Sequence, residues 1–297
     1  MARTSDLGRV LTAMVTPMTP EGAVDLDGAV RLAVRLSESG SDGLVILGTT
    51  GEAPTLSKEE KKELIRAVVG AVGGAVTVIA GTGSYDTAAS VELTREAEKL
   101  GVDGILAVVP YYNRPPQEGL YRHFQAILQA TSLPVMLYNI PSRTGRNLEP
   151  ETVARLAEAP NLAAIKEAAG SLDQVSQLIQ VLPERVRVYA GDDSLTLPML
   201  AVGGYGVVSV ASHLVGTQIQ EMIAAYLEGR VAEAARIHHH LYPLFRGLFI
   251  TTNPIPVKAA LEMVGLPAGP PRLPLPPASD AEREAIRQAL RQVGLLD

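Results

Sequence analysis

The chain has 297 residues, 46% hydrophobic and 20% charged, which is enough for a large core in one α/β domain or two smaller ones. The net charge of −6 and 4% aromatic content argue against nucleic-acid binding, which needs a basic surface and usually stacking residues. No apolar run could span a membrane, the N-terminus lacks the apolar segment of a signal peptide, and cysteine is absent. We therefore expect a cytoplasmic protein without disulfides or thiol chemistry.

Strand-like runs alternate with amphipathic stretches along most of the chain. Each run is apolar nearly throughout, which is typical of parallel strands covered on both faces. Eight such β-then-α units over roughly 220 residues match the rhythm of a (β/α)₈ barrel. The runs lie at residues 10–18, 42–48, 76–83, 104–113, 134–141, 162–168, 186–193 and 206–211.

Start and stop signals bound the helices between these runs. Ser57 with Glu60 forms a capping-box pattern, and Asp27 and Asp86 precede amphipathic stretches. Gly101 follows a helix-like run, where a left-handed cap favours glycine. These signals predict helices that begin after Asp27, Ser57 and Asp86.

The predicted fold is α/β, a TIM barrel over residues 1–225 with a C-terminal helical extension over residues 226–297. The competing open sheet usually has a G-x-G-x-x-G turn after its first strand, and here TPMTP (16–20) follows instead. The proline-rich loop at 267–279 is too short and too apolar for an interdomain linker. We therefore expect the extension to pack on the barrel.

Lys166 is the most informative residue, because it alone among six lysines lies in a strand-like run, LAAIKEA. Burial of an ammonium group is costly and favours the neutral amine. A neutral amine attacks a carbonyl to form a Schiff base. The alternative is a strand-end lysine that extends to solvent, but the following residues suggest that Lys166 lies at the rim of the barrel.

Other polar side chains follow the strands at the end where barrels carry their active sites. The phenol of Tyr138 suits proton transfer, although it could be a core aromatic. Thr49 and Thr50 either cap a loop or bind a carboxylate. Arg143 is a surface charge or a carboxylate clamp, and Tyr112 belongs to a tyrosine pair that could lie in a subunit contact.

We expect no metal site and no dinucleotide site. The consecutive histidines 238–240 diverge around their predicted helix and cannot share a metal. Asp192 and Asp193 could bind Mg²⁺, but no second acidic cluster supports this. Gly81-Thr82-Gly83 lacks the rest of a dinucleotide fingerprint.

Several motifs resemble the dihydrodipicolinate synthase family, within the pyruvate-dependent class I aldolase (N-acetylneuraminate lyase) superfamily, over nearly the whole chain. The NIPSRTG segment is the narrowest of them, because its arginine is similar to the one that holds the carboxylate of aspartate semialdehyde. The motifs are GTTGEAPTLS (48–57), PYYNRP (110–115), LYNIPSRTG (137–145), IKEA (165–168), GDD (191–193), GVVSV (206–210) and NPIPVKAALEMVG (253–265).

The resemblance implies catalytic roles for four residues. Lys166 would form a Schiff base with pyruvate, and Tyr138 would donate and accept protons. Thr49 would link Tyr138 to Tyr112 in a proton relay. In family members this last tyrosine reaches into a neighbouring subunit, which implies an oligomer, commonly a homotetramer built as a dimer of dimers.

The resemblance also implies a substrate site without a metal or an organic cofactor. Thr50 would bind the pyruvate carboxylate, and Arg143 would bind the carboxylate of L-aspartate 4-semialdehyde. Gly191 and Val208 would line the pyruvate pocket. The implied activity is that of a lyase in the diaminopimelate route to lysine.

One region departs from the family pattern, the surface where lysine-inhibited members bind the end product. Here Ala53, Pro54, Lys58, Tyr85 and Ala89 stand where an inhibited member has Ser, Ala, His, Asn and Glu. Loss of the acidic side chain and gain of a cation should repel the ammonium of lysine. The resemblance therefore predicts weak or absent feedback inhibition.

Two alternative functions stay open at this point. A 2-keto-3-deoxy sugar acid aldolase or sialic-acid lyase would use the same Schiff base with another acceptor, and Arg143 argues against it. A non-catalytic barrel that serves as a binding or scaffold protein would keep the fold and form no pyruvate adduct.

Overall fold

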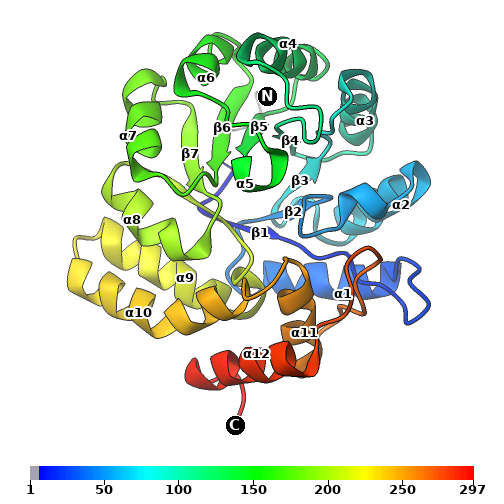
Figure 1. Ribbon diagram of the computed structural model, residues 1–297, viewed down its shortest axis with the longest axis vertical. Helices are drawn as coiled ribbons and strands as arrows, with labels where there is room; N and C mark the ends of the chain where they lie inside the picture. Colours follow the sequence, from blue (N-terminus) through cyan, green and yellow to red (C-terminus); the bar gives the residue numbers. More distant parts are fainter. Residues whose placement is uncertain (1–6) are drawn as a thin grey trace.

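The computed structural model describes residues 7–297 and contains eight parallel strands that form a closed barrel (Figure 1). The predicted (β/α)₈ barrel is thereby confirmed. Closure comes from the pairing of β1 with β8, in which Leu11 lies opposite Val208. The strands are β1 (Val10–Ala13), β2 (Gly43–Ile46), β3 (Thr77–Gly81), β4 (Gly104–Val108), β5 (Val135–Asn139), β6 (Leu162–Glu167), β7 (Arg187–Ala190) and β8 (Gly206–Ser209).

The helices around the barrel begin where the capping residues predict, with one exception. Ser57 and Glu60 form the expected capping box, and Asp86 caps its helix. The prediction for Asp27 is wrong, because Asp25 is the N-cap and Asp27 lies in the first turn. The helices are α1 (Leu26–Ser37), η1 (Ala53–Thr55), α2 (Lys58–Val72), α3 (Thr87–Lys99), α4 (Gln117–Leu128), α5 (Pro141–Thr144), α6 (Pro150–Leu156), α7 (Leu172–Val181), η2 (Asp193–Leu195), α8 (Thr196–Ala201) and α9 (Ser212–Leu227).

Three further helices, α10 (Val231–Gly247), α11 (Ile255–Met263) and α12 (Asp280–Gln292), lie beside α9 and α1 on one side of the barrel (Figure 1). α10 packs on α9 and α12, and α12 packs on α11. Because α9 ends at Leu227, we propose that the extension starts just after it, slightly beyond the boundary expected at residue 225. None of the helices in residues 7–297 is long and apolar enough to cross a membrane.

The apolar residues form two layers, one on each face of the sheet. Leu11, Ile79, Met136 and Val208 belong to a cluster inside the barrel. A larger cluster fills the space between the strands and the surrounding helices. This division follows from the alternation of side chains along each strand, and it leaves the carboxyl ends of the strands free for polar residues.

Candidate active site

Lys166 and Tyr138 lie directly opposite each other on β6 and β5. The Lys166 Nζ atom lies 4.1 Å from the centre of the Tyr138 ring, over its face. Lys166 is 6% exposed and Tyr138 is 4% exposed. The amine is therefore enclosed beside the phenol and does not extend into bulk solvent.

Asn139 follows Tyr138 on β5, and Glu167 follows Lys166 on β6. These two following residues hold the strands in their orientation. Asn139 Nδ2 donates to both carboxylate oxygens of Glu167, at 3.2 and 3.0 Å, and Gln174 Nε2 donates to Glu167 Oε2 at 3.0 Å. Burial raises the pKa of Glu167, and the hydrogen bonds from Asn139 oppose that shift. Because side chains alternate along a strand, this network keeps Tyr138 and Lys166 directed into the barrel.

Gly191, at the end of β7, lies where only a hydrogen fits. A Cβ atom at this position would stand 2.5 Å from the Cβ of Ala168 and 3.2 Å from the carbonyl oxygen of Glu167. The Gly191 amide donates to that same carbonyl at 2.8 Å. The glycine therefore allows β6 and β7 to approach closely beside Lys166.

The two aspartates that follow have different surroundings. Asp193 is buried and accepts hydrogen bonds from the Ser209 hydroxyl and from the amides of Val210 and Ala211. Burial raises the pKa of Asp192, and the positive charge of Lys166 opposes that shift. Within residues 7–297, no group of three or more His, Cys, Asp or Glu side chains is placed to hold a metal ion.

The GTTG turn after β2 has a strained backbone on both sides. Leu47 and Glu52 have φ values of 57° and 55°, which side chains larger than glycine rarely adopt. Thr50, between them, is buried, and Thr49 is partly exposed. Such a conformation persists only where its surroundings hold it in place.

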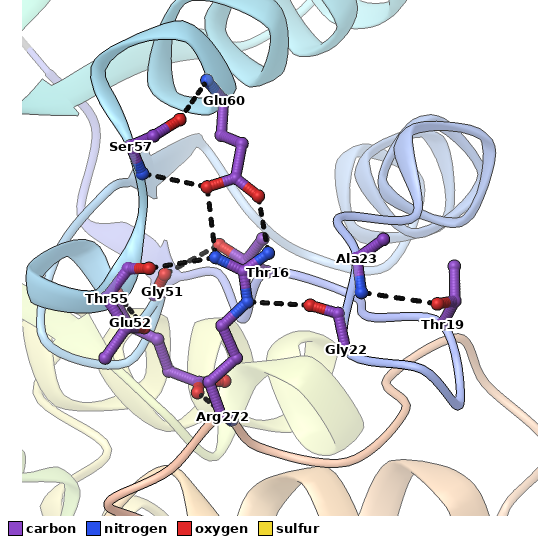
Figure 2. Close-up of polar contacts among 10 residues, drawn as sticks. All are labelled: Thr16, Thr19, Gly22, Ala23, Gly51, Glu52, Thr55, Ser57, Glu60 and Arg272. Carbon is purple, nitrogen blue, oxygen red and sulfur yellow. Dashed lines mark hydrogen bonds and ion pairs between the residues drawn. The ribbon is translucent and has the colours of Figure 1, made fainter.

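Two contacts hold this turn. The Thr16 hydroxyl donates to the Gly51 carbonyl at 2.7 Å (Figure 2). The Glu52 carboxylate forms an ion pair with Lys258 of α11, with 2.6 Å between Oε1 and Nζ. Both charged side chains are almost completely buried, so Lys258 is a second enclosed lysine that the sequence pattern did not indicate.

Arg272, in the proline-rich loop, joins the extension to the same turn. Its amide donates to Glu52 Oε2 at 2.7 Å, and its guanidinium bonds Glu60 of α2 and the carbonyls of Gly22 and Thr55 (Figure 2). The guanidinium lowers the pKa of Glu60 to about 2. Neither Arg272 nor Glu52 is among the site residues predicted from the sequence, and only the fold brings them together.

A cavity of about 400 Å³ opens above these elements, lined by Thr49, Tyr138, Arg143 and Asn253 among others. Arg143 Nη2 donates to the main-chain carbonyl of Asn253 at 3.0 Å. Asn253 Nδ2 donates in turn to the Thr50 hydroxyl oxygen at 2.9 Å. Asn253 therefore connects two predicted site residues, although no role is predicted for it from the sequence.

Within a single chain, neither Tyr112 nor Val208 lines the cavity. Tyr112 is 92% exposed with a φ of 70°, and its neighbour Tyr111 lines the cavity instead, with its ring edge-on to Tyr85 at 5.3 Å between ring centres. Val208 is fully buried inside the barrel. In the single chain Thr49, Tyr138 and Arg143 thus line the cavity, Lys166 packs on Tyr138 and Thr50 is bonded to Asn253, while Tyr112 stays at the surface.

Residues 6–293 match the model of the dihydrodipicolinate synthetase family. The chain belongs to this family. The 4-hydroxy-tetrahydrodipicolinate synthase of Moorella thermoacetica is 60% identical over 289 residues, which are 97% of this chain and 99% of the relative. The match covers the barrel and nearly the whole extension.

Solved structures of the family superpose on the full fold. The dihydrodipicolinate synthase of Cyanidioschyzon merolae, determined with lysine bound, is 49% identical with a TM-score of 0.96 and covers 98% of this chain and 99% of its own. A variant described as the first monomeric dihydrodipicolinate synthase is 42% identical, with a TM-score of 0.94 and 97% of each chain covered. The second comparison shows that family membership alone does not decide the state of assembly.

Proposed function

We propose that this chain acts as a 4-hydroxy-tetrahydrodipicolinate synthase, a lyase of the class I aldolase type, and that it condenses pyruvate with L-aspartate 4-semialdehyde through a Schiff base on Lys166. The observation that carries the proposal is the enclosed amine. Lys166 Nζ lies over the Tyr138 ring at 4.1 Å, and Tyr138 lines a cavity that also contains Arg143. These positions support a nucleophile beside its acid/base group, with a carboxylate clamp in the cavity that the acid/base group lines.

The reaction follows from the chemistry of the amine. Lys166 adds to the pyruvate carbonyl, and loss of water gives a protonated imine. The imine withdraws electrons, so the methyl group of pyruvate loses a proton and an enamine forms. The enamine carbon attacks the aldehyde of the second substrate. The amino group of that substrate then displaces Lys166 by transimination and closes the ring.

Tyr138, Thr49 and Thr50 are assigned to proton transfer and to the first substrate. The Tyr138 phenol donates and accepts protons as the imine forms and the enamine develops. Thr49 connects it to a relay, and Thr50 binds the pyruvate carboxylate. Gly191 and Val208 shape the space around the adduct. Support comes from the position of Tyr138 beside Lys166 and from the close approach of β6 and β7 that Gly191 allows.

Tyr112 completes the relay from a neighbouring copy of the chain in this proposal, within a homotetramer built as a dimer of dimers. Its side chain is 92% exposed, and Tyr85 near the same surface is 56% exposed. Asn113 Nδ2 donates to the Tyr85 carbonyl at 3.0 Å, so the two loops are held together. Large exposed aromatic side chains are typical of protein interfaces.

Arg143 favours a semialdehyde acceptor over a sugar acid. Its guanidinium reaches the cavity while one nitrogen is held by the Asn253 carbonyl. Among residues 7–297, the guanidinium of Arg143 makes only this hydrogen bond. Its remaining N–H groups can therefore bind a carboxylate in a bidentate geometry. We therefore assign it to the carboxylate of L-aspartate 4-semialdehyde.

Borohydride trapping tests the proposal. Incubation with pyruvate and borohydride should leave a stable adduct on Lys166, detectable as a mass increase of the peptide that contains it. Lys166→Ala should remove the adduct and the turnover of pyruvate with L-aspartate 4-semialdehyde, measured with a coupled reductase. Lys99→Ala, a change at an exposed lysine, serves as the control and should keep both. Turnover of a sugar acid but not of the semialdehyde would refute the acceptor, and a folded protein without an adduct would refute the enzyme.

A further inference from the structure

The segment NPIPVKAALEMVG belongs to the extension, yet its first residue lines the cavity of the barrel. Asn253 is 6% exposed and lies just before α11. The first turn of α11 is fixed in place because Lys258 pairs with Glu52 beneath the GTTG turn. The position of the Asn253 side chain is therefore tied to the active-site loop.

The hydrogen bonds of Asn253 leave one polar atom without a partner. Its Nδ2 donates to the Thr50 hydroxyl oxygen at 2.9 Å, and its main-chain carbonyl accepts from Arg143 at 3.0 Å. Its Oδ1 is buried and has no hydrogen-bond partner among residues 7–297. Because a buried polar atom without a partner is costly and Asn253 lines the cavity, this unpartnered acceptor indicates a place for a ligand donor.

We propose that Asn253 Oδ1 accepts a hydrogen bond from the amino group of the acceptor aldehyde, so that Asn253 selects an amino aldehyde over one without the amine. The inference rests on the proposed function and deepens it. Arg143 and Thr50 are assigned to the two substrate carboxylates, and Asn253 is bonded to both residues. A carboxylate cannot donate to an amide oxygen, whereas an amine can.

A neutral amide suits this task better than a charged side chain. An amide oxygen accepts a hydrogen bond from an ammonium group and also from the neutral amine that must attack the imine. A carboxylate at this position would favour the ammonium form and repel both substrate carboxylates. The orientation is consistent with the role of Thr50, because a hydroxyl that accepts from Asn253 Nδ2 keeps its own proton for the pyruvate carboxylate.

The test compares two aldehydes that share a carboxylate and differ in the amine. The KM of L-aspartate 4-semialdehyde and the inhibition constant of 4-oxobutanoate are measured for the wild-type enzyme, Asn253→Ala and Asn253→Asp. For Asn253→Ala we expect the KM of the amino aldehyde to rise roughly tenfold or more beyond any change for 4-oxobutanoate. Asn253→Asp keeps an acceptor and should retain the preference for the amino aldehyde. Thr252→Ala, at an exposed neighbouring residue, is the matched control.

An equal loss on both aldehydes for Asn253→Ala would overturn the proposal, because it would mean that the residue only supports Thr50 and Arg143. Loss of the preference in Asn253→Asp as well would also overturn it. If Asn253→Ala does not fold, Asn253→Asp still tests the proposal, because loss of its preference for the amino aldehyde would overturn it. Failure of the proposed function itself has a different signature, since the wild-type enzyme would then form no borohydride adduct or no product.

Discussion

At the scale of single residues, Tyr138 has the environment of a group that transfers protons without a fixed partner. Its phenol has no hydrogen bond to a neighbouring side chain among residues 7–297, while its ring is packed under the Lys166 amine. Tyr138→Phe keeps this ring contact and removes only the hydroxyl. We expect kcat to fall by a factor of roughly 10² to 10⁴ with the fold unchanged. Steady-state kinetics and far-UV circular dichroism measure the two effects.

A Tyr138→Phe enzyme within a factor of about three of wild type would remove the phenol from the proton transfer. Phe124→Leu is unsuitable as a control, because that side chain is core. Tyr242→Phe is suitable, since Tyr242 is 43% exposed on α10 and should keep full activity.

The residues that could be predicted from the sequence are those with local signatures. A lysine in an apolar strand-like run and a tyrosine on the neighbouring run are visible without coordinates, and the register places them side by side. Asn253 and Arg272 carry no such signature, because both lie in loops of the extension. Their roles depend on contacts with residues about 200 positions earlier in the chain, such as Thr50 and Glu52. Only tertiary structure could reveal them.

At the scale of elements, the pair of Glu52 and Lys258 couples α11 to the GTTG turn. Burial lowers the pKa of Lys258, and the Glu52 carboxylate opposes that shift. Lys258→Met leaves a buried carboxylate without its cation and should cost about 3 to 5 kcal/mol of unfolding free energy. It should also lower kcat, because the strained turn that carries Thr49 loses its support.

The double variant Lys258→Met with Glu52→Gln removes both charges and should recover a large part of the lost stability. Urea unfolding of the wild type, Lys258→Met, Glu52→Gln and the double variant gives the comparison. If the double variant is as unstable as the sum of the single ones, the two side chains do not act as a pair.

The helices α2 and α3 carry Lys58 and Ala89, two of the substituted positions on which inhibition by lysine is expected to depend. The cavity continues past Ala53 and Pro54 to Lys58 and Ala89, so four of the five substituted positions line it. Lys58 forms an ion pair with Glu92 at 3.0 Å, so this cation is partly neutralised, which the sequence pattern did not indicate.

We still expect weak or absent inhibition, because the acidic group at position 89 is missing and the Glu92 carboxylate in the same cavity is engaged by Lys58. Activity assays over a range of lysine concentrations measure it. Strong inhibition by micromolar lysine would refute the expectation. Ala89→Glu restores the acidic group and should make the enzyme more sensitive to lysine, with Ala281→Glu at an exposed position of α12 as the control substitution.

At the scale of the whole molecule, the barrel could be predicted because its signal is repeated eight times. Each apolar run followed by an amphipathic stretch is weak evidence alone, and the eight together leave few alternatives. The extension could be predicted only as helical. Its contact with the active site could not, because the loop of Arg272 shows no periodic pattern and two of its hydrogen bonds go to the carbonyls of Gly22 and Thr55, which any sequence provides.

A buried neutral histidine bonds the segments that follow the two closing strands of the barrel, and it makes the stability of the fold depend on pH. His213, at the start of α9, accepts from the Val15 amide at 3.1 Å, and its other ring nitrogen donates to the Val210 carbonyl at 2.8 Å. These bonds join the segments that follow β1 and β8, the pair of strands that closes the sheet. Burial lowers the pKa of His213 from 6.5 to about 4.

The direction of the pH effect follows from this shift. Between pH 6.5 and pH 4 the unfolded chain binds a proton at His213 that the native chain does not bind. The contribution of the neutral histidine is therefore complete above pH 6.5 and is lost as the pH falls, by about 2 kcal/mol at pH 5 and about 3 kcal/mol at pH 4 and below. Glu167 and Asp193 have raised pKa values and act in the opposite direction, so a single wild-type curve does not isolate the histidine.

A comparison with His213→Gln isolates it, because the amide keeps a donor and an acceptor and does not titrate. The variant should be less stable than the wild type at pH 7, and the gap should shrink by about 2 kcal/mol on going to pH 5. Denaturant unfolding at several pH values measures the gap, and the contributions of Glu167 and Asp193 cancel in the difference. A gap that stays constant from pH 7 to pH 5 would mean that His213 has the same pKa in the native and the unfolded chain, and it would refute the neutral histidine that accepts from Val15.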